Sequence, residues 1–239
     1  MTVEVYTDYA ALSRRAAELV AELVRAKPGA VLGLPTGATP KGFYRALAAS
    51  GLSLAGVTTF NLDEYVGLPR EHPESYYTYM KQHLFDHVDL RPENCHLPDG
   101  MAADAAAECR RYEEAIRAAG GIDLLLLGLG LNGHIGFNEP GTPWDSRTRK
   151  VALAEETRQA NARFFDNPDE VPTHALTMGI GTILEARRIL LLASGAAKAA
   201  IVREMLEGVP RVEVPATALQ THPAVTVLLD KEAARLARL

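Results

Sequence analysis

The chain has 239 residues, of which 47% are hydrophobic and 23% are charged, a composition typical of one sizeable, folded globular domain. The formal net charge of -5 argues against a nucleic-acid binder, which usually presents a basic face. The longest apolar run, residues 122–127, is too short to span a bilayer, and the first residues lack the features of a signal peptide, so we expect a cytoplasmic protein without membrane contact.

Apolar runs alternate with helical patterns along the whole chain. Continuous apolar runs are typical of strands buried on both faces, and they occur at residues 30–34, 57–60, 123–127, 189–193 and 224–229. Helical patterns lie between them, at residues 8–25, 40–49, 104–119 and 196–206. This alternation predicts a single three-layer α/β domain over residues 1–239, with a mostly parallel sheet and helices on both faces.

The first strand-to-helix junction has the composition of an anion-binding turn. Thr39 suits the N-cap of the following helix and Pro40 suits its first position. The free amides and positive dipole end of such a helix attract an anion, usually a phosphate. Gly37 lets the backbone come close to a ligand, and Thr36 can donate a hydroxyl hydrogen bond. A tight turn without a ligand is the alternative interpretation.

A pair of carboxyl groups, Asp63 and Glu64, follows the next predicted strand and is expected in a loop. Ligands of doubly wound α/β proteins bind at the carboxyl ends of the strands, so these side chains are candidates for the same crevice. A carboxylate there is a plausible base for removing a proton next to a carbonyl group. A helix-capping or surface role for Asp63 is the alternative.

His83 and His87 have the spacing of metal ligands on one helix face. The residues between them do not fit the HExxH pattern, and no third ligand is evident. We therefore expect no metal site.

Residues 128–133 match the pattern GxGxxG, which is typical of dinucleotide-binding turns. The stretch that follows, 134–143, is full of helix breakers where a helix should begin. An acidic ribose ligand should follow about twenty residues on, but residues 148–150 read Thr-Arg-Lys. The context excludes a dinucleotide cofactor.

The same glycine-rich loop carries Asn132, His134, Asn138 and Glu139. Polar groups at the end of a buried strand are costly unless they are used. A histidine with a nearby carboxylate can move a proton near neutral pH. A histidine that merely satisfies loop hydrogen bonds is the alternative.

Two further segments complete the pattern. Residues 144–172 are polar and rich in arginine without a strand-like run, which predicts a helical lid. The junction 194–198 is a second candidate anion site, because Lys198 lies in the first turn of a helix, where a cation is unfavourable unless an anion binds nearby. A solvated surface lysine is the alternative.

Several of these segments resemble those of the glucosamine-6-phosphate deaminases, members of the glucosamine/galactosamine-6-phosphate isomerase family. The matches occur in the same order along nearly the whole chain, and they are Gly33–Pro40, Thr59–Leu68, His72–Tyr77, Gly133–Pro140, Ser146–Arg149, Asn161–Asp166 and Ser194–Lys198. The resemblance implies the modified Rossmann-like fold of that family with a mobile lid. It also implies conversion of glucosamine 6-phosphate to fructose 6-phosphate and ammonia.

The resemblance also implies residue roles. Asp63 would move the proton from C2 to C1, His134 would open the sugar ring, and Glu139 would be its carboxylate partner. Asn132 lies where some members have Asp and others Asn, so a contribution to ring opening is implied without its charge. The substrate phosphate would contact Thr36, Gly37, Ala38, Thr39, Arg163 and Lys198.

The implied chemistry has no redox step and needs no electron sink, so we expect no cofactor. An amino-sugar phosphate is the expected small-molecule partner, and self-association stays open. A 6-phosphogluconolactonase-like hydrolase and a non-catalytic sugar-phosphate sensor are the rival interpretations.

Overall fold

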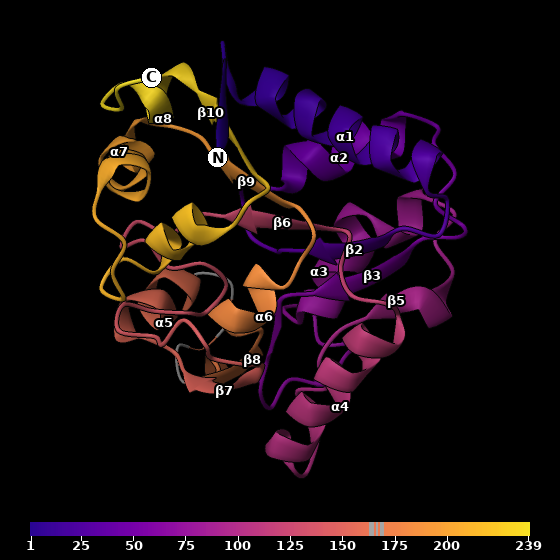
Figure 1. Ribbon diagram of the computed structural model, residues 1–239. Coiled ribbons are helices and arrows are strands. Elements are labelled where there is room, and N and C mark those ends of the chain that lie inside the picture. Colours follow the sequence, from indigo (N-terminus) through magenta and orange to yellow (C-terminus); the bar gives the residue numbers. More distant parts are fainter. Residues whose placement is uncertain (163–164, 166, 168–169) are drawn as a thin grey trace.

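The computed structural model describes residues 1–162, 165, 167 and 170–239 (Figure 1). Its main sheet has seven parallel strands in the order β1-β10-β9-β6-β2-β3-β5. Five of them are the predicted strands within one or two residues, and β1 and β5 extend the two edges. The strands are β1 Thr2–Tyr6, β2 Val31–Leu34, β3 Thr58–Asn61, β5 Cys95–His96, β6 Leu124–Gly128, β9 Ile189–Ala193 and β10 Val225–Asp230.

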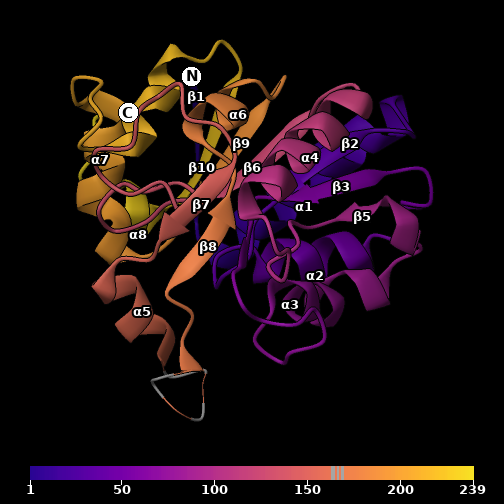
Figure 2. The same cartoon turned by 90° about the horizontal axis from the view of Figure 1, so that it is seen from below.

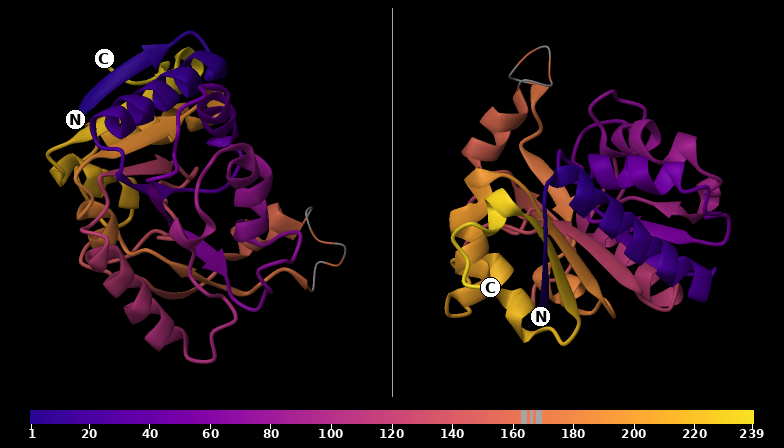
Figure 3. Two further views of the ribbon diagram at one scale, coloured as in Figure 1. Left: turned by 90° about the vertical axis from the view of Figure 1, so that its right-hand side faces the viewer. Right: turned by 90° about the horizontal axis from the view of Figure 1, so that it is seen from above.

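The helices cover both faces of this sheet, as the sequence predicts (Figures 2 and 3). They are α1 Tyr9–Ala26, α2 Lys41–Ala49, α3 Tyr76–His83, α4 Ala105–Ala118, α5 Glu155–Ala162, α6 Ile180–Leu184, α7 Ala199–Glu207 and α8 Lys231–Ala234. A 3₁₀ turn, Ala196–Lys198, precedes α7, so the predicted helix 196–206 has two parts.

Two hydrophobic cores lie on opposite faces of the sheet. Within β6, Leu124 and Leu126 belong to the core under α1, α2 and α3. Leu125 and Leu127 belong to the core under α4, α6 and α7. Successive side chains of a strand point to opposite faces, which is why the strands are apolar without alternation. The three-layer α/β class is confirmed.

A second, antiparallel sheet lies at the carboxyl end of the main one and was not predicted. Its order is β4-β8-β7, with β4 Asp63–Tyr65, β7 Arg149–Ala152 and β8 His174–Thr177. The main chain passes from β3 to β4 through Leu62, whose amide donates to Leu34 and whose carbonyl accepts from Met178. The expectation that Asp63 and Glu64 lie in a loop is therefore wrong, because β8 pairs with them.

The segment 144–172 contains both a helix and a strand. Helix α5 agrees with the prediction and projects away from the two cores (Figures 2 and 3). Strand β7 contradicts the expectation that the segment has no strand. Its side chains alternate between half-buried and exposed, because successive side chains of a strand point to opposite faces and one face of β7 meets solvent. A strand with an exposed face carries polar residues such as Arg149 and Lys150, so β7 has no apolar run by which it could be predicted.

The carboxyl ends of β2, β3, β6 and β9 meet at one edge of the main sheet, beside the small sheet (Figure 1). The candidate site lies at this edge. Among the described residues, no helix combines the length and the apolarity that crossing a membrane requires.

Candidate active site

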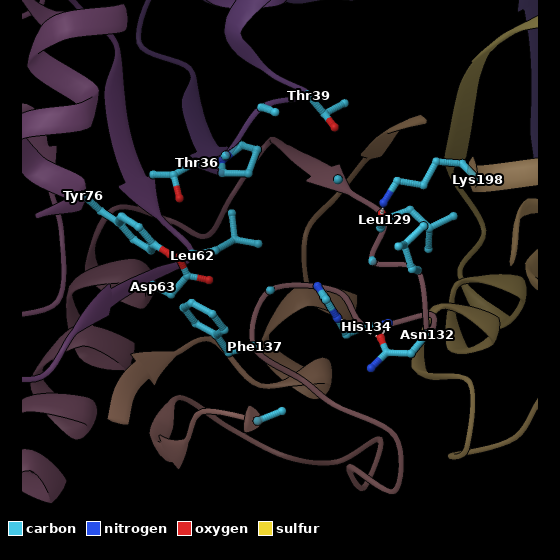
Figure 4. A pocket seen from close by; sticks show the side chains of 18 residues that line it. Thr36, Thr39, Leu62, Asp63, Tyr76, Leu129, Asn132, His134, Phe137 and Lys198 are labelled. Atoms are coloured by element: carbon cyan, nitrogen blue, oxygen red, sulfur yellow. Dashed lines mark hydrogen bonds between the residues drawn. The ribbon is translucent and has the colours of Figure 1, made fainter. Parts of the chain in front are cut away.

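A cavity of about 750 Å³ opens at this edge of the main sheet (Figure 4). Of the residues predicted for the site, Glu64, Asn138 and Glu139 do not line it, and Arg163 lies outside the described residues. It is lined by Pro35, Thr36, Gly37, Ala38, Thr39, Leu62, Asp63, Tyr76, Gly128, Leu129, Gly130, Leu131, Asn132, His134, Gly136, Phe137, Ala154 and Lys198. Segments from four strand ends therefore converge on one cavity.

The turn after β2 is held by tyrosine hydroxyl groups that bind its carbonyl oxygens. Tyr79 donates to Gly37 O at 2.6 Å, and Tyr44 donates to the carbonyl of Pro35. Tyr9 donates to Thr39 O at 2.8 Å and accepts from the amide of Gly42 at 2.7 Å. Helix α2 thus begins at Lys41 and is capped by Tyr9, so the prediction of Thr39 as N-cap and Pro40 as first helical residue is wrong. A hydroxyl from α1 replaces the local cap.

With its carbonyls bound, this turn presents amides to the cavity. Within the described part of the chain, the amides of Gly37, Ala38 and Thr39 donate to no other protein group. Gly37 has φ +97°, a conformation that favours glycine. A row of unpaired amides at the start of a helix is a typical anion site.

Lys198 reaches the cavity from the opposite side (Figure 4). Its Nζ donates to Leu129 O at 2.5 Å, and burial lowers the pKa of Lys198. The turn before it is anchored by Asp230, which accepts from the amide of Gly195 at 3.0 Å and from the hydroxyl of Ser194. Asp230 thus binds the first polar groups of this junction, while Lys198, which lines the cavity, has further N–H groups with which to bind a ligand.

Asp63 lines the cavity at the start of β4, with 7% of its surface exposed. Burial, with the negative charge of Glu64 as the second cause, raises the pKa of Asp63 to about 8. Within the described residues its carboxylate accepts no hydrogen bond. A carboxylate in such surroundings binds a proton strongly, as a base acting near neutral pH requires.

His134 faces Asp63 across the cavity (Figure 4). Its Nδ1 lies 2.8 Å from Oδ1 of Asn132, and Nδ2 of Asn132 donates to Oε2 of Glu139 at 2.7 Å. A carboxylate only accepts, so the amide of Asn132 must turn its NH₂ towards Glu139 and its oxygen towards His134. The proton of the imidazole therefore lies on Nδ1, and Nε2 is left to accept a proton.

Burial is the largest influence on His134, and it favours the neutral imidazole. Burial lowers its pKa, while the charge of Glu139 opposes that effect. The imidazole also packs directly on Gly130, since a Cβ at that position would lie only 2.3 Å from the ring. Glu139 does not line the cavity and contacts the site through Asn132.

One predicted residue is not described by the structure, and two aromatic cavity residues were not predicted. Arg163 lies outside the described residues. Tyr76 and Phe137 line the cavity beside Asp63 (Figure 4) without having been selected. Both fall inside the family-like segments, which was the available signal. No helix follows residues 128–133, as the helix breakers in 134–143 predict.

The described residues contain no group of three or more His, Cys, Asp or Glu side chains placed to hold a metal ion. Helix α3 ends at His83, and Leu84 separates it from the 3₁₀ turn that carries His87. The two histidines therefore do not share one helix face.

Comparison with known proteins places this geometry in context. Residues 7–228 match the model of the family described as glucosamine-6-phosphate isomerases/6-phosphogluconolactonase. A glucosamine-6-phosphate deaminase of Halothermothrix orenii is 54% identical, and the match covers 99% of this chain and 100% of the relative.

Two solved structures resemble this chain along nearly its whole length. A monomeric glucosamine-6-phosphate deaminase is 52% identical with a TM-score of 0.95, covering 99% of this chain and 100% of that one. A 6-phosphogluconolactonase of Trypanosoma brucei is 23% identical with a TM-score of 0.80, covering 98% of this chain and 97% of that one. The second likeness is one of fold alone.

Proposed function

The chain belongs to the family of glucosamine-6-phosphate isomerases and 6-phosphogluconolactonases, and we propose that it performs the deaminase reaction with Asp63 and His134 as its proton-transfer groups. It converts glucosamine 6-phosphate to fructose 6-phosphate and ammonia. The observation that carries the residue assignment is the placement of Asp63 and His134 on opposite walls of one cavity, below a turn of free amides (Figure 4).

Ring opening is assigned to His134. Its Nε2 takes the proton of the sugar O1 hydroxyl and delivers a proton to the ring oxygen, so the C1–O5 bond breaks and C1 becomes an aldehyde. Asn132 and Glu139 hold the Nδ1 proton in place during this exchange. The neutral state of His134 suits the first step, because an imidazolium has no free acceptor.

Proton transfer between carbons is assigned to Asp63. The aldehyde acidifies the C2–H bond, and Asp63 removes that proton. The electron pair forms the C1–C2 double bond, and O1 takes a proton from solvent to complete the enol. Return of the proton to C1 gives an imine at C2. Water adds to this imine, and breakage of the C2–N bond releases ammonia and leaves the ketone.

The substrate phosphate is assigned to the turn of Thr36, Gly37, Ala38 and Thr39, with Lys198 opposite. Free amides and a buried ammonium group favour a dianion over water. Fixing the phosphate at one end of the open sugar places C2 near Asp63, which is where binding energy assists the reaction. Arg163 and a closing lid over about residues 144–172 belong to the same proposal.

The deaminase reaction is favoured over lactone hydrolysis by two observations. The deaminases are 54% and 52% identical to this chain, whereas the lactonase resemblance is one of fold. Lactone hydrolysis also has no carbon-bound proton for Asp63 to remove. A cytoplasmic location stays a prediction from the sequence, and self-association stays open.

The test is incubation of the purified protein with glucosamine 6-phosphate while ammonia and fructose 6-phosphate are both measured. We expect the two products in equal amounts, and loss of both in the Asp63→Asn variant. Hydrolysis of 6-phosphogluconolactone is measured in parallel. Lactone turnover without ammonia release would overturn the proposal in favour of the lactonase.

A further inference from the structure

Glu64 is the neighbour of Asp63 on β4, and its side chain lies on the other face of the strand. Successive side chains of a strand alternate, so Asp63 points into the active-site cavity and Glu64 points away from it. Both carboxyl groups are nevertheless buried, with 7% and 4% of their surfaces exposed. Two buried carboxyl groups on adjacent residues are costly, and local packing alone does not require them.

The carboxylate of Glu64 joins strand β4 to the first turn of α3. Its Oε1 accepts from the amides of Tyr65 and Tyr76, each at 2.9 Å. Its Oε2 accepts from the amide of Tyr77 at 3.1 Å. A carboxylate at the start of a helix is favoured by the unpaired amides and by the helix dipole.

The elements that Glu64 joins both contribute to the catalytic cavity. Strand β4 carries Asp63, and the start of α3 carries Tyr76, whose ring lies beside Asp63 (Figure 4). The distance between these two cavity residues therefore depends on a carboxylate that does not itself line the cavity.

We propose that Glu64 is a positioning residue for the deaminase reaction, which sets both the placement of Asp63 against Tyr76 and the readiness of Asp63 to take a proton. This inference rests on the proposed function. Glu64 acts on the substrate only through its neighbours, first by its three amide hydrogen bonds and second by its negative charge.

The charge of Glu64 has a definite direction of effect. It is the second cause, after burial, of the raised pKa of Asp63. The pKa of Glu64 itself is raised to about 7 by burial, and the three amides oppose this shift. Three amides bind the carboxylate of Glu64, whereas the described residues donate no hydrogen bond to Asp63, so the negative charge of the pair is favoured on Glu64. That charge holds the proton on Asp63 to a higher pH.

The other groups near the pair come from several elements. Four tyrosines lie close enough for the charge of Asp63 to raise the pKa of their hydroxyl groups, and they are Tyr44, Tyr65, Tyr76 and Tyr112. Glu64 lines a separate cavity of about 360 Å³ together with the polar groups Arg70, Tyr77, His96, Asp99 and Arg111. Of these, Arg70 lowers the pKa of Glu64, and Arg111 is paired with Glu108 at 2.6 Å.

The first variant is Glu64→Gln, which keeps the shape of the side chain and removes its charge. Its kcat/KM is measured against pH together with that of the wild type. We expect the acid limb to move to lower pH by about half a unit or more. The control is Glu71→Gln, which removes an exposed carboxyl group from the neighbouring loop and should leave the limb in place. An unmoved limb in Glu64→Gln would overturn the proposal.

The second variant, Glu64→Asp, keeps the charge but is too short to reach the amides of both Tyr76 and Tyr77. We expect the acid limb to stay and kcat to fall several-fold. Wild-type kcat in this variant would contradict the positioning role, even if the glutamine variant does not fold.

A readout without turnover separates this inference from the proposed function. Carboxyl ¹³C signals are titrated by NMR in the wild type and in Glu64→Gln, with the signal of Asp63 identified by its loss in Asp63→Asn. We expect Asp63 to titrate at lower pH once Glu64 is neutralised, whether or not ammonia is released. An unchanged titration would refute the role of the Glu64 charge, whereas a protein that fails only in ammonia release loses the proposed function alone.

Discussion

The carboxylate of Glu139 lies 3.7 Å from Nδ1 of His134, too far for a direct hydrogen bond, because Asn132 stands between them. The amide side chain accepts from the imidazole at 2.8 Å and donates to the carboxylate at 2.7 Å. The charge of Glu139 is thus felt by His134 without a direct contact, and the amide fixes which ring nitrogen carries the proton.

The first prediction concerns this bridge. Replacement Asn132→Ala removes the acceptor that holds the Nδ1 proton, so we expect kcat/KM to fall by about 10-fold or more. Replacement Asn132→Asp keeps an acceptor next to Nδ1 and adds a charge, which should raise the pKa of His134. NMR titration of the imidazole signals measures that shift. A lower pKa in Asn132→Asp would contradict the arrangement described here.

The second prediction concerns the activity of Asp63 as pH changes. Since the pKa of Asp63 is about 8 and a base must be ionised, kcat/KM should rise with pH and level off above that value. Replacement Asp63→Asn should lower kcat by roughly 10²–10⁴-fold while substrate still binds, as checked by calorimetry. A bound but fully active Asp63→Asn variant would disprove the assignment.

The third prediction concerns the stability cost of the same carboxyl group. The pKa of this carboxyl group is 3.8 in the unfolded chain, and it rises to about 8 in the folded protein. The unfolded state therefore gains stability as pH rises between those values, and the folded protein loses it. At pH 8 we expect Asp63→Asn to melt about 2–4 °C or more above the wild type, and the gain should vanish below pH 4. A gain that is independent of pH would contradict this origin.

The fourth prediction concerns Gly130. A methyl group there would lie 2.3 Å from the imidazole of His134, so Gly130→Ala should displace the ring and leave the fold intact. We expect kcat to fall by about 100-fold with an unchanged circular dichroism spectrum. The matched control is Gly29→Ala, whose new methyl group would meet only Gly56 O, at 3.9 Å. Equal activity of the two variants would argue against close packing of the His134 ring on Gly130.

The fifth prediction concerns the phosphate turn. Replacement Tyr79→Phe removes the hydroxyl that holds Gly37 O at 2.6 Å, and Lys198→Met removes the cation opposite. We expect KM to rise about 10-fold or more for Lys198→Met and less for Tyr79→Phe, with kcat nearly unchanged in the latter. Tyr77→Phe is the control from the same helix. A change in kcat alone would place these groups at the reacting carbons instead.

Much of the fold was predictable because its signals are local. Strands such as β6 and β9 are apolar at every position, since helices cover both faces, and five of the seven main strands were found in this way. The turn at Gly37 and the loop of His134 could be identified from glycines and polar groups that a buried strand end does not otherwise tolerate.

The small sheet escaped prediction because its pairing is long-range. Strand β4 pairs with β8, more than 100 residues later in the chain. Both β4 and β7 also carry charged residues, which are not typical of strands. The cap of α2 was missed for the same reason, since Tyr9 lies 33 residues before the amide of Gly42 that it accepts from.

The sequence by itself predicted which side chains are candidates for the chemistry and which strand ends hold them, because residue type and spacing are local properties. Only the tertiary structure decided which of these side chains hold a proton, and on which atom. The pKa of Asp63 follows from burial and from Glu64, and the free nitrogen of His134 follows from an amide turned by Glu139. Burial and hydrogen-bond direction depend on neighbours brought together by folding, so no reading of adjacent residues supplies them.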